Sequence, residues 1–487
     1  VSTTTIADTL ALAATSGGAY YSGCGTVYTK DQNGTHGTLR VANTLSTQTG
    51  YNARTPVTDE GDWTFDAVVV GSCGRVSVGA DRTLTLPNGL ASVSSSDTSS
   101  PYDGILVNGG AIAAGTGDQT MTGGWTLQIN QPYTFPGNLS LESGARLGIF
   151  RMLMSGTNNT LKADYTISGN LTVDASSSVD VSQIYHTTGV NSEYPPATHG
   201  GWSVYNNASN TYGSVFHPAT FGSSQSKGFY GSGVLKLTVG GALTVNGSIG
   251  AFGAVSDSTY DNSAAASGGS LDITAGSLSG SGSIDASGAA GRWNYAGGGA
   301  GGRIAVRLTG VNADFTNSPA INAQGRYGYA FDARAAKFAS AGTVYTQTAA
   351  QGEKGGTIFV SNYDKAFSDF TTFIGGGKAF PTTPIVARGI GKDEAIDFKN
   401  AALVVTKTAI AEVSSPTLKM KSLNVANGSR LELAGNTLMV NAAVIGETKL
   451  PSGTYTASSA EVAGYVVDSG EGGTLVVVPT ATVICIR

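Results

Sequence analysis

Three glycines in the stretch WNYAGGGAGGRIAVRL, residues 293–308, match the G-x-G-x-x-G pattern of a dinucleotide-binding loop. They are Gly297, Gly299 and Gly302. Such a loop holds a pyrophosphate only when a buried strand precedes it and a helix N-terminus follows it. Here a polar and aromatic stretch precedes the glycines, and residues 303–308 alternate with period 2, which predicts a strand. The context is therefore inverted, and nucleotide chemistry is not favoured.

Three of the four histidines lie in one segment, residues 183–233, where they would have to converge to bind a metal ion. They are His186, His199 and His217. Their spacings match neither the helical nor the hairpin arrangement of known metal sites. We therefore expect histidines on a surface loop and no metal site.

Paired carboxylates are the next candidates for chemistry. Glycoside hydrolysis needs two of them about 5 to 10 Å apart, and the chain has no Asp-Asp pair. The chain accordingly predicts no catalytic residue and no cofactor, with calcium as the single alternative. Hard oxygen ligands on turns suit Ca²⁺, and the aspartates that would supply them are Asp257, Asp261, Asp272 and Asp285.

The chain has three cysteines, and none has the spacing of metal ligands. In an exported protein Cys24 and Cys73 would close one disulfide loop near the N-terminus. Two alternatives stay open for Cys485, namely a buried small apolar side chain and a bond to another molecule.

Composition favours many short strands joined by tight turns. Glycine accounts for 69 of 487 residues, and only 13% of residues are charged, against about 25% in ordinary globular domains. The net charge is −5, without a basic stripe, so nucleic acid is not an expected partner. No apolar run of about 20 residues predicts a membrane-spanning helix. The start at Val1 suggests a mature secreted protein from which a targeting segment was removed.

A hexapeptide with the pattern Gly-Gly-x-(Leu/Ile)-x-(Val/Ile) recurs along the chain. It occurs as GGALTV (240–245), GGSLDI (268–273), GGRIAV (301–306), GGTIFV (355–360) and GGTLVV (472–477). A second pattern, Ile-x-Ala-x-Gly, occurs at 249–253, 284–288 and 321–325. Each hexapeptide predicts a short strand entered from a glycine corner, where glycine supplies both a positive φ and a close backbone approach. Stacked copies bury a shared core, which predicts an all-β parallel β-helix, that is, a β-solenoid rod.

The chain divides into three predicted regions. Residues 1–130 form an N-terminal β-rich domain or cap, 131–375 a solenoid interrupted by a loop insertion at 183–233, and 376–487 a C-terminal strand region. The insertion is the expected place for recognition. Its aromatic rings would stack on sugars of a surface glycan or a partner, although they would equally pack against the scaffold. The candidates are Tyr194, Trp202, Tyr205, Tyr212, Phe229 and Tyr230.

Two β-prone runs lie close to the C-terminus. Either they pair within their own chain or they add a strand to a second copy by β-augmentation. The residues of this self-assembly candidate are Val476, Val477, Val478, Val483, Ile484, Cys485 and Ile486.

Three stretches of the chain together resemble glycine-rich β-helix surface proteins of bacteria, such as adhesins and autotransporter passengers. They are the glycine-rich GGRIAV, the downstream SAGTVYTQTA (340–349) and GGTIFV. Residues 433–478 look like the closing segment of proteins with autotransporter-associated β-strand repeats. The resemblance implies secretion and a role at the cell surface, and it transfers no catalytic residue.

The sequence thus predicts a secreted structural subunit of an extracellular filament or sheath, polymerising through terminal strands. A monomeric β-helical adhesin that binds surface glycans is the alternative, and a β-helix enzyme that degrades polysaccharides is the second alternative.

Overall fold

The computed structural model describes most of the chain, in seventeen stretches. They are 24–32, 34–42, 54–58, 63–71, 74–96, 103–149, 162–182, 185–186, 198–202, 211–224, 230–253, 265–291, 298–326, 339–362, 382–387, 397–470 and 472–479. The chain forms two compact units. The first comprises residues 1–154, 161–180 and 243–248, and the second comprises 155–160, 181–242 and 249–487.

The described residues form an all-β structure whose strands pair mostly in parallel. Helical structure in these stretches is confined to 3₁₀ turns, at Leu90–Ser92, Ala349–Gln351 and Ala460–Val462. None of the described helices is long and apolar enough to cross a bilayer. The all-β expectation from glycine, serine and threonine content is confirmed.

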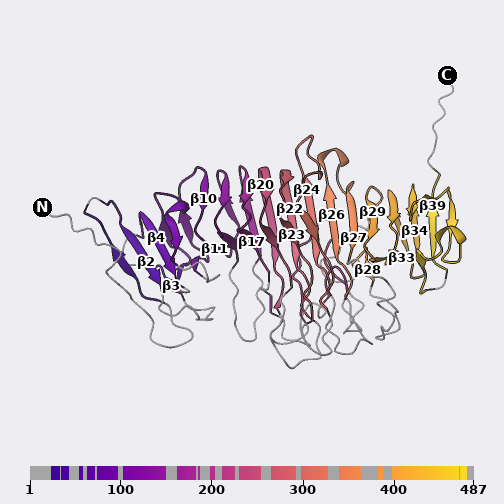
Figure 1. The fold of residues 1–487 in the computed structure, drawn as a ribbon, viewed down its shortest axis with the longest axis horizontal. Coiled ribbons are helices and arrows are strands. Elements are labelled where there is room, and N and C mark those ends of the chain that lie inside the picture. The colour runs from indigo at the N-terminus through magenta and orange to yellow at the C-terminus, as the bar shows by residue number, and fades with distance from the viewer. Residues whose placement is uncertain are drawn as a thin grey trace, which may run out of the picture. The chain divides into compact units, whose positions relative to one another are not determined.

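Two parallel ladders organise most of the first unit, and Figure 1 shows their strands side by side. One ladder contains β3 (Thr55–Pro56), β5 (Arg75–Val78), β8 (Gly104–Val107), β11 (Thr126–Ile129), β14 (Arg146–Gly148) and β17 (Ser178–Asp180). The other contains β10 (Gln119–Met121), β13 (Leu139–Leu141), β16 (Leu171–Val173) and the last residues of β20 (Val234–Val245). Two short parallel pairs lie beside these ladders. One joins β12 (Tyr133–Phe135) with β15 (Ala163–Ile167), and the other joins β6 (Thr83–Thr85) with β9 (Ala111–Ala113). A further sheet joins β1 (Val27–Thr29), β2 (Thr38–Ala42), β4 (Ala67–Gly71) and β7 (Val93–Ser95).

Residues at equal positions of successive strands lie in register in the first unit. Leu139 pairs with Leu171, which pairs with Leu243, and all three are buried. A polar ladder precedes them at the corner: Asn138 donates from Nδ2 to Asp118 Oδ2 over 2.9 Å and accepts the Asn170 N–H at 2.7 Å. The similar sequences GNLSL (137–141) and GNLTV (169–173) therefore stack directly on one another. The ladder through β11 and β14 also continues past residue 130, where a domain boundary was predicted.

The second unit contains one long ladder and three shorter ones. The long ladder runs through β20, β22 (Ser270–Ser279), β24 (Arg303–Leu308), β26 (Thr343–Gln347), β27 (Thr357–Ser361), β29 (Ala402–Thr406), β32 (Ser422–Val425), β35 (Ala443–Ile445) and β36 (Thr448–Lys449). A second contains β21 (Ser248–Gly250), β23 (Ser283–Asp285) and β25 (Ala320–Asn322). The others are β28 (Thr383–Pro384), β30 (Ile410–Glu412), β33 (Arg430–Glu432) and β38 (Val466–Val467), and β31 (Thr417–Met420), β34 (Thr437–Val440), β39 (Thr474–Val477) and β37 (Gly453–Tyr455). β18 (Tyr185–His186) and β19 (Tyr230–Gly231) form an antiparallel pair.

Close backbone approach explains the glycines of GGRIAV, whereas a positive φ does not. A Cβ atom built on Gly302 would overlap the Gly269 carbonyl oxygen, and one on Gly342 would overlap the Gly302 carbonyl oxygen. Neither glycine has a φ in the left-handed region. The predicted crowding between neighbouring corners is therefore confirmed, and the predicted positive φ is wrong at these positions. Residues 303–308 form β24, as period 2 predicted.

Several ladders end on strands that discourage further parallel pairing. In the first unit β1 is antiparallel to β2, and the edge strand β3 contains Pro56. In the second unit β36 is antiparallel to β35, and β37 is antiparallel to β39. Short edge strands, prolines and charges are the usual protection of a sheet edge.

Candidate functional site

The long ladder of the second unit changes its buried side between β26 and β27. Upstream, Ile304 of β24 is fully buried and pairs with Val344 of β26. Val344 then lies opposite Phe359, and Phe359 pairs with Val404, but the last two are only half-buried. The opposite side stays buried across the same strands. Tyr345 pairs with Ile358 and Ile358 pairs with Leu403, and all three are at most 1% exposed.

The change has a structural cause on each side of the sheet. The ladder of β21 and β23, which faces the upstream side, ends at β25 among the described residues. On the other side a second core takes over, in which Phe216 packs edge-to-face on Tyr345 with ring centroids 4.9 Å apart and also contacts Phe398. The side of the sheet that was buried against β25 is consequently open from β27 onward.

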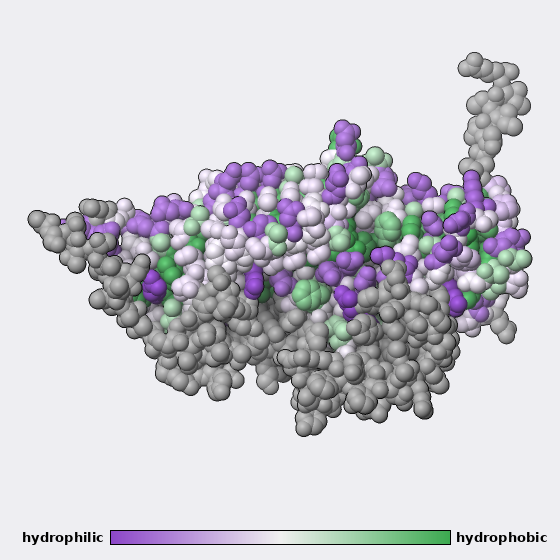
Figure 2. Space-filling view, viewed as in Figure 1, coloured by the Kyte–Doolittle hydropathy of each residue, from purple (hydrophilic) through white to green (hydrophobic). Residues whose placement is uncertain are grey.

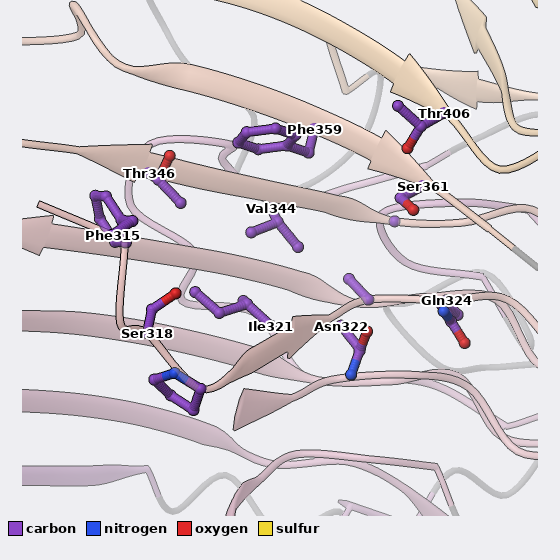
Figure 3. A pocket seen from close by; sticks show the side chains of 13 residues that line it. Phe315, Ser318, Ile321, Asn322, Gln324, Val344, Thr346, Phe359, Ser361 and Thr406 are labelled. Atoms are coloured by element: carbon purple, nitrogen blue, oxygen red, sulfur yellow. The ribbon is translucent and has the colours of Figure 1, made fainter. Parts of the chain in front are cut away.

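A pocket of about 270 Å³ lies where this side opens, and Figure 3 shows its lining. Loop 309–319 and β25 form one wall, and β26, β27 and β29 form the other. Its lining residues are Phe315, Ser318, Pro319, Ile321, Asn322, Ala323, Gln324, Gly342, Val344, Thr346, Phe359, Ser361 and Thr406. The phenylalanine rings and the amide side chains of Asn322 and Gln324 occupy different parts of the pocket (Figure 3).

The main chain of β25 adds a donor and an acceptor to this pocket. Ala320 donates its N–H to Gly282, and Asn322 accepts the Ala286 N–H, so both residues bond toward β23. Alternate residues of a parallel strand bond to opposite sides. The N–H and C=O of Ile321 therefore point away from β23, toward the open edge, and Ile321 lines the pocket.

The lining determines which chemistry the pocket supports. None of the residues that line it is ionisable, so the lining offers no general acid, general base or charged nucleophile. It offers two apolar rings, two amides, several hydroxyl groups and a strand edge. Such a surface is chemically complementary to a neutral ligand that has both apolar faces and hydroxyl groups.

The described parts of the predicted recognition loop are packed instead on the other side of the long ladder. Tyr212 is fully buried and Trp202 is 8% exposed, so these two rings offer no stacking platform. The indole N–H of Trp202 donates to Thr382 Oγ1 at 3.0 Å. Tyr194, Tyr205 and Phe229 and the side chain of Tyr230 lie outside the described residues. Aromatic abundance in this segment reflects packing, at least for the rings that the structure describes.

His199 is buried, contrary to the expectation of surface histidines. Its Nδ1–H donates to the Gly268 carbonyl oxygen at 2.8 Å, its Nε2 accepts the Thr220 hydroxyl at 2.8 Å, and its ring stacks on Tyr212 at 4.7 Å. Burial, with the nearby Arg303 guanidinium, lowers the pKa of His199 to about 3. Its neutral ring therefore acts as a fixed hydrogen-bonding link between residues 198–224 and the glycine corner at Gly268.

Two arginines of β24 anchor the same segment. Arg303 is fully buried and donates from Nε to the Tyr212 carbonyl oxygen at 2.8 Å and from Nη1 to Thr343 Oγ1 at 2.9 Å. Arg307 donates to the Phe216 carbonyl oxygen at 2.6 Å and forms an ion pair with Asp272. A hollow of about 210 Å³ beside it is lined by Phe216, His217, Arg307, Tyr345, Gln347, Gly352, Glu353 and Lys354. The Arg307 guanidinium in this hollow is already paired with Asp272 and with the Phe216 carbonyl oxygen.

The predicted metal ligands are not brought together. Asp272 pairs with Arg307, and Asp285 accepts the Ser287 N–H at 2.7 Å. Asp257 and Asp261 lie outside the described residues, as does the side chain of His186. His217 is 64% exposed, with Nδ1 3.8 Å from Asp272, which agrees with a surface histidine. Within the described stretches no group of three His, Cys, Asp or Glu side chains is placed to hold a metal ion.

The remaining predicted residues lie at the two ends of the chain. Cys24 is buried, and its carbonyl oxygen accepts the Thr55 hydroxyl at 2.5 Å, whereas Cys73 and Cys485 lie outside the described residues. Val476 and Val477 belong to β39, which pairs with β34 on one side and with β37 on the other. Val478 donates its N–H to Val440. This first β-prone run is therefore paired within its own chain, and residues 483–486 lie outside the described part.

No protein-family model, curated protein or solved structure matches this chain. The resemblance to autotransporter-associated repeats thus stays a prediction, and the candidate site rests on its own geometry. Sequence reasoning missed this pocket, although one signal was present. In GGTIFV the residue between the two buried positions is Phe359, the one aromatic residue at this position, where the other copies carry Thr244, Asp272, Ala305 or Val476.

Proposed function

We propose that this chain is a secreted β-solenoid protein of the cell surface that binds neutral glycans and does not cleave them. Of the functions that the sequence predicted, this corresponds to the glycan-binding adhesin. The pocket between β25 and β29 carries the proposal. It combines two phenylalanine rings with amides, hydroxyls and an open strand edge, in a lining without ionisable groups.

The solenoid part of the proposal is supported by the order in which the chain visits its ladders. In the first unit β11, β13, β14, β16 and β17 alternate between two parallel ladders. In the second unit β22, β23, β24 and β25 alternate in the same way. Each coil then contributes one strand to each ladder, and apolar side chains in register form the core between them. The glycine corners at Gly269, Gly302 and Gly342 support the same arrangement, because each of these corners lies against the one before it.

Glycan binding is supported by the complementary chemistry of sugars and the pocket. A pyranose ring presents C–H groups on its faces and hydroxyl groups around its rim. The rings of Phe315 and Phe359 suit the faces, and Asn322, Gln324 and the Ile321 main chain suit the rim. A volume of about 270 Å³ lies near the lower limit of ligand pockets, about 300 Å³. The pocket therefore suits a small part of a glycan.

The filament alternative has less support from the described residues. Its first candidate strand, β39, already has a neighbour on each side. Its second candidate, residues 483–486, lies outside the described part. Polymerisation through terminal strands therefore stays a prediction without a structural observation in its favour.

Binding of the intact chain to a panel of neutral and acidic glycans tests the proposed function. We expect neutral glycans to bind, and Phe359→Ala to weaken their binding about tenfold, because the ring supplies part of the apolar contact. Phe252→Ala is the matched control, since Phe252 is 40% exposed and does not line the pocket. Equal affinities of wild type and Phe359→Ala, or no binding of any glycan, would refute the proposal.

A further inference from the structure

A row of outward-facing side chains leads from the pocket across the neighbouring strands of the second unit. Phe359 pairs with Val404, Val404 with Asn424, and Asn424 with Val444. Their neighbours along the strands, Leu403 and Leu423 among them, are buried on the opposite side. The four side chains therefore lie on the side of the sheet that opens at the pocket, one on each of β27, β29, β32 and β35.

Hydroxyl groups flank this row on both sides. Ser361 pairs with Thr406 on one flank. On the other flank Thr357 pairs with Ala402, which pairs with Ser422. Because residues two apart on a strand point to the same side, these flanking positions face the same solvent as the central row. The result is a track with a mainly apolar centre and polar borders. Figure 2 shows apolar side chains gathered over β27 and β29 on the surface it presents.

We propose, building on the glycan-binding function above, that the ligand is an extended, uncharged, β-linked polysaccharide lying across β26, β27, β29, β32 and β35. Its chain runs perpendicular to the strands, with the pocket holding one part and the track holding the rest. Ring faces lie over the central row, and equatorial hydroxyl groups reach the flanking serine and threonine side chains.

The spacing of the strands supports an extended chain. Neighbouring strands lie about 4.8 Å apart, so the four intervals from β26 to β35 span about 19 Å. One interval is close to the length of one pyranose residue in an extended β-linked chain. A sugar residue then meets one strand at a time along the track.

Charge along the track supports an uncharged chain. The outward positions of β27, β29, β32 and β35 named above carry no ionisable side chain. The first charge in register with the row is that of Lys449, which lies opposite Val444 on β36. A polysaccharide with a carboxylate on each sugar would repel itself along this surface without a row of cations to compensate it.

Titration calorimetry on the full chain tests this inference. The probes are neutral β-1,4-linked gluco-, xylo-, manno- and chito-oligosaccharides of one to six residues, with oligogalacturonates as the charged counterpart. We expect the affinity for one neutral series to rise with each added residue up to about five, the number of strands crossed. Oligogalacturonates of equal length should bind at least about tenfold more weakly.

Variants at the far end of the track separate it from the pocket. Asn424→Glu and Val444→Glu should each weaken hexasaccharide binding about fivefold and leave disaccharide binding unchanged. Val476→Glu is the control, because Val476 is a half-buried outward residue of β39, in a different ladder. Asn424 is exposed, so its variant remains informative if Val444→Glu lowers the melting temperature.

The outcomes distinguish the two proposals. Any of three results would overturn the track. They are equal affinity for disaccharide and hexasaccharide, full hexasaccharide affinity in both track variants, and equally tight binding of oligogalacturonates. Glycan binding at the pocket would still stand if Phe359→Ala weakened it. Absence of binding by every neutral series would overturn both proposals.

Discussion

Val344 and Phe359 lie opposite each other in the antiparallel pair of β26 and β27, and the buried side of the sheet changes between them. Val344 is 8% exposed and continues the buried row of Leu271 and Ile304. Phe359 begins the half-exposed row that passes through Val404. The candidate site lies at this point because one sheet partner ends there and another has taken over on the opposite side.

The first prediction concerns the polar part of the pocket. Asn322→Leu keeps the approximate size of the side chain and removes its amide, which should weaken neutral-glycan binding about fivefold to tenfold through loss of hydrogen bonds to sugar hydroxyls. Because no ionisable residue lines the pocket, wild-type affinity should be constant from pH 5 to 8. Calorimetry at several pH values checks both. A bell-shaped pH profile would instead indicate a titrating group in the site.

The second prediction concerns the buried His199. Its pKa of about 3 in the folded protein lies below the ordinary value of about 6.5, so the unfolded chain binds more protons between these values. The stability that His199 contributes is therefore complete above pH 6.5 and is lost as the pH falls toward 3. Between pH 7 and 5 the loss should approach about 2 kcal/mol.

Urea unfolding of wild type and His199→Gln at both pH values measures this loss. Glutamine cannot titrate, so the free energy of unfolding of the variant should depend less on pH. His217→Gln is the control, since His217 is 64% exposed. If wild type and His199→Gln lose the same stability on acidification, His199 is not responsible for it.

A third prediction concerns the glycine corners. Gly342→Ala should lower the free energy of unfolding by more than about 2 kcal/mol, because the new Cβ would overlap the Gly302 carbonyl oxygen and force two strand corners apart. Gly117→Ala is the matched control, because a Cβ there would have no atom within 4 Å and its φ lies outside the left-handed region. Comparable destabilisation by the two substitutions, measured in urea, would contradict the crowding explanation.

A fourth prediction concerns the C-terminal strands. Removal of residues 480–487 should leave the melting temperature unchanged, because β39 keeps its pairing with β34 and β37. Removal of residues 472–487 should lower it, because β39 and the buried Leu475 and Val477 are lost. Negative-stain electron microscopy of the same proteins examines the filament alternative. Filaments formed by the intact chain and absent after the shorter truncation would support strand donation by residues 483–486.

Local sequence patterns specify the class of structure and much of its local detail. The period-2 alternation of residues 303–308 predicted β24 correctly. Alternation fixes which residues of a strand share a side, and the glycine pair before β24 marks a corner that admits no Cβ. These are local properties, so they can be recognised in a few consecutive residues.

Which side of each strand is buried depends on packing between distant parts of the chain. Alternation in GGTIFV identifies Ile358 and Val360 as buried, but it does not say against which layer. That depends on where β25 ends and on Phe216, which lies more than a hundred residues before β27. The same long-range packing buries Tyr212 and His199, which lie in the segment predicted as a recognition loop. It leaves Phe359 half-exposed. Period 2 specifies two sides of a strand, whereas solvent exposure depends on what the rest of the chain places against each side.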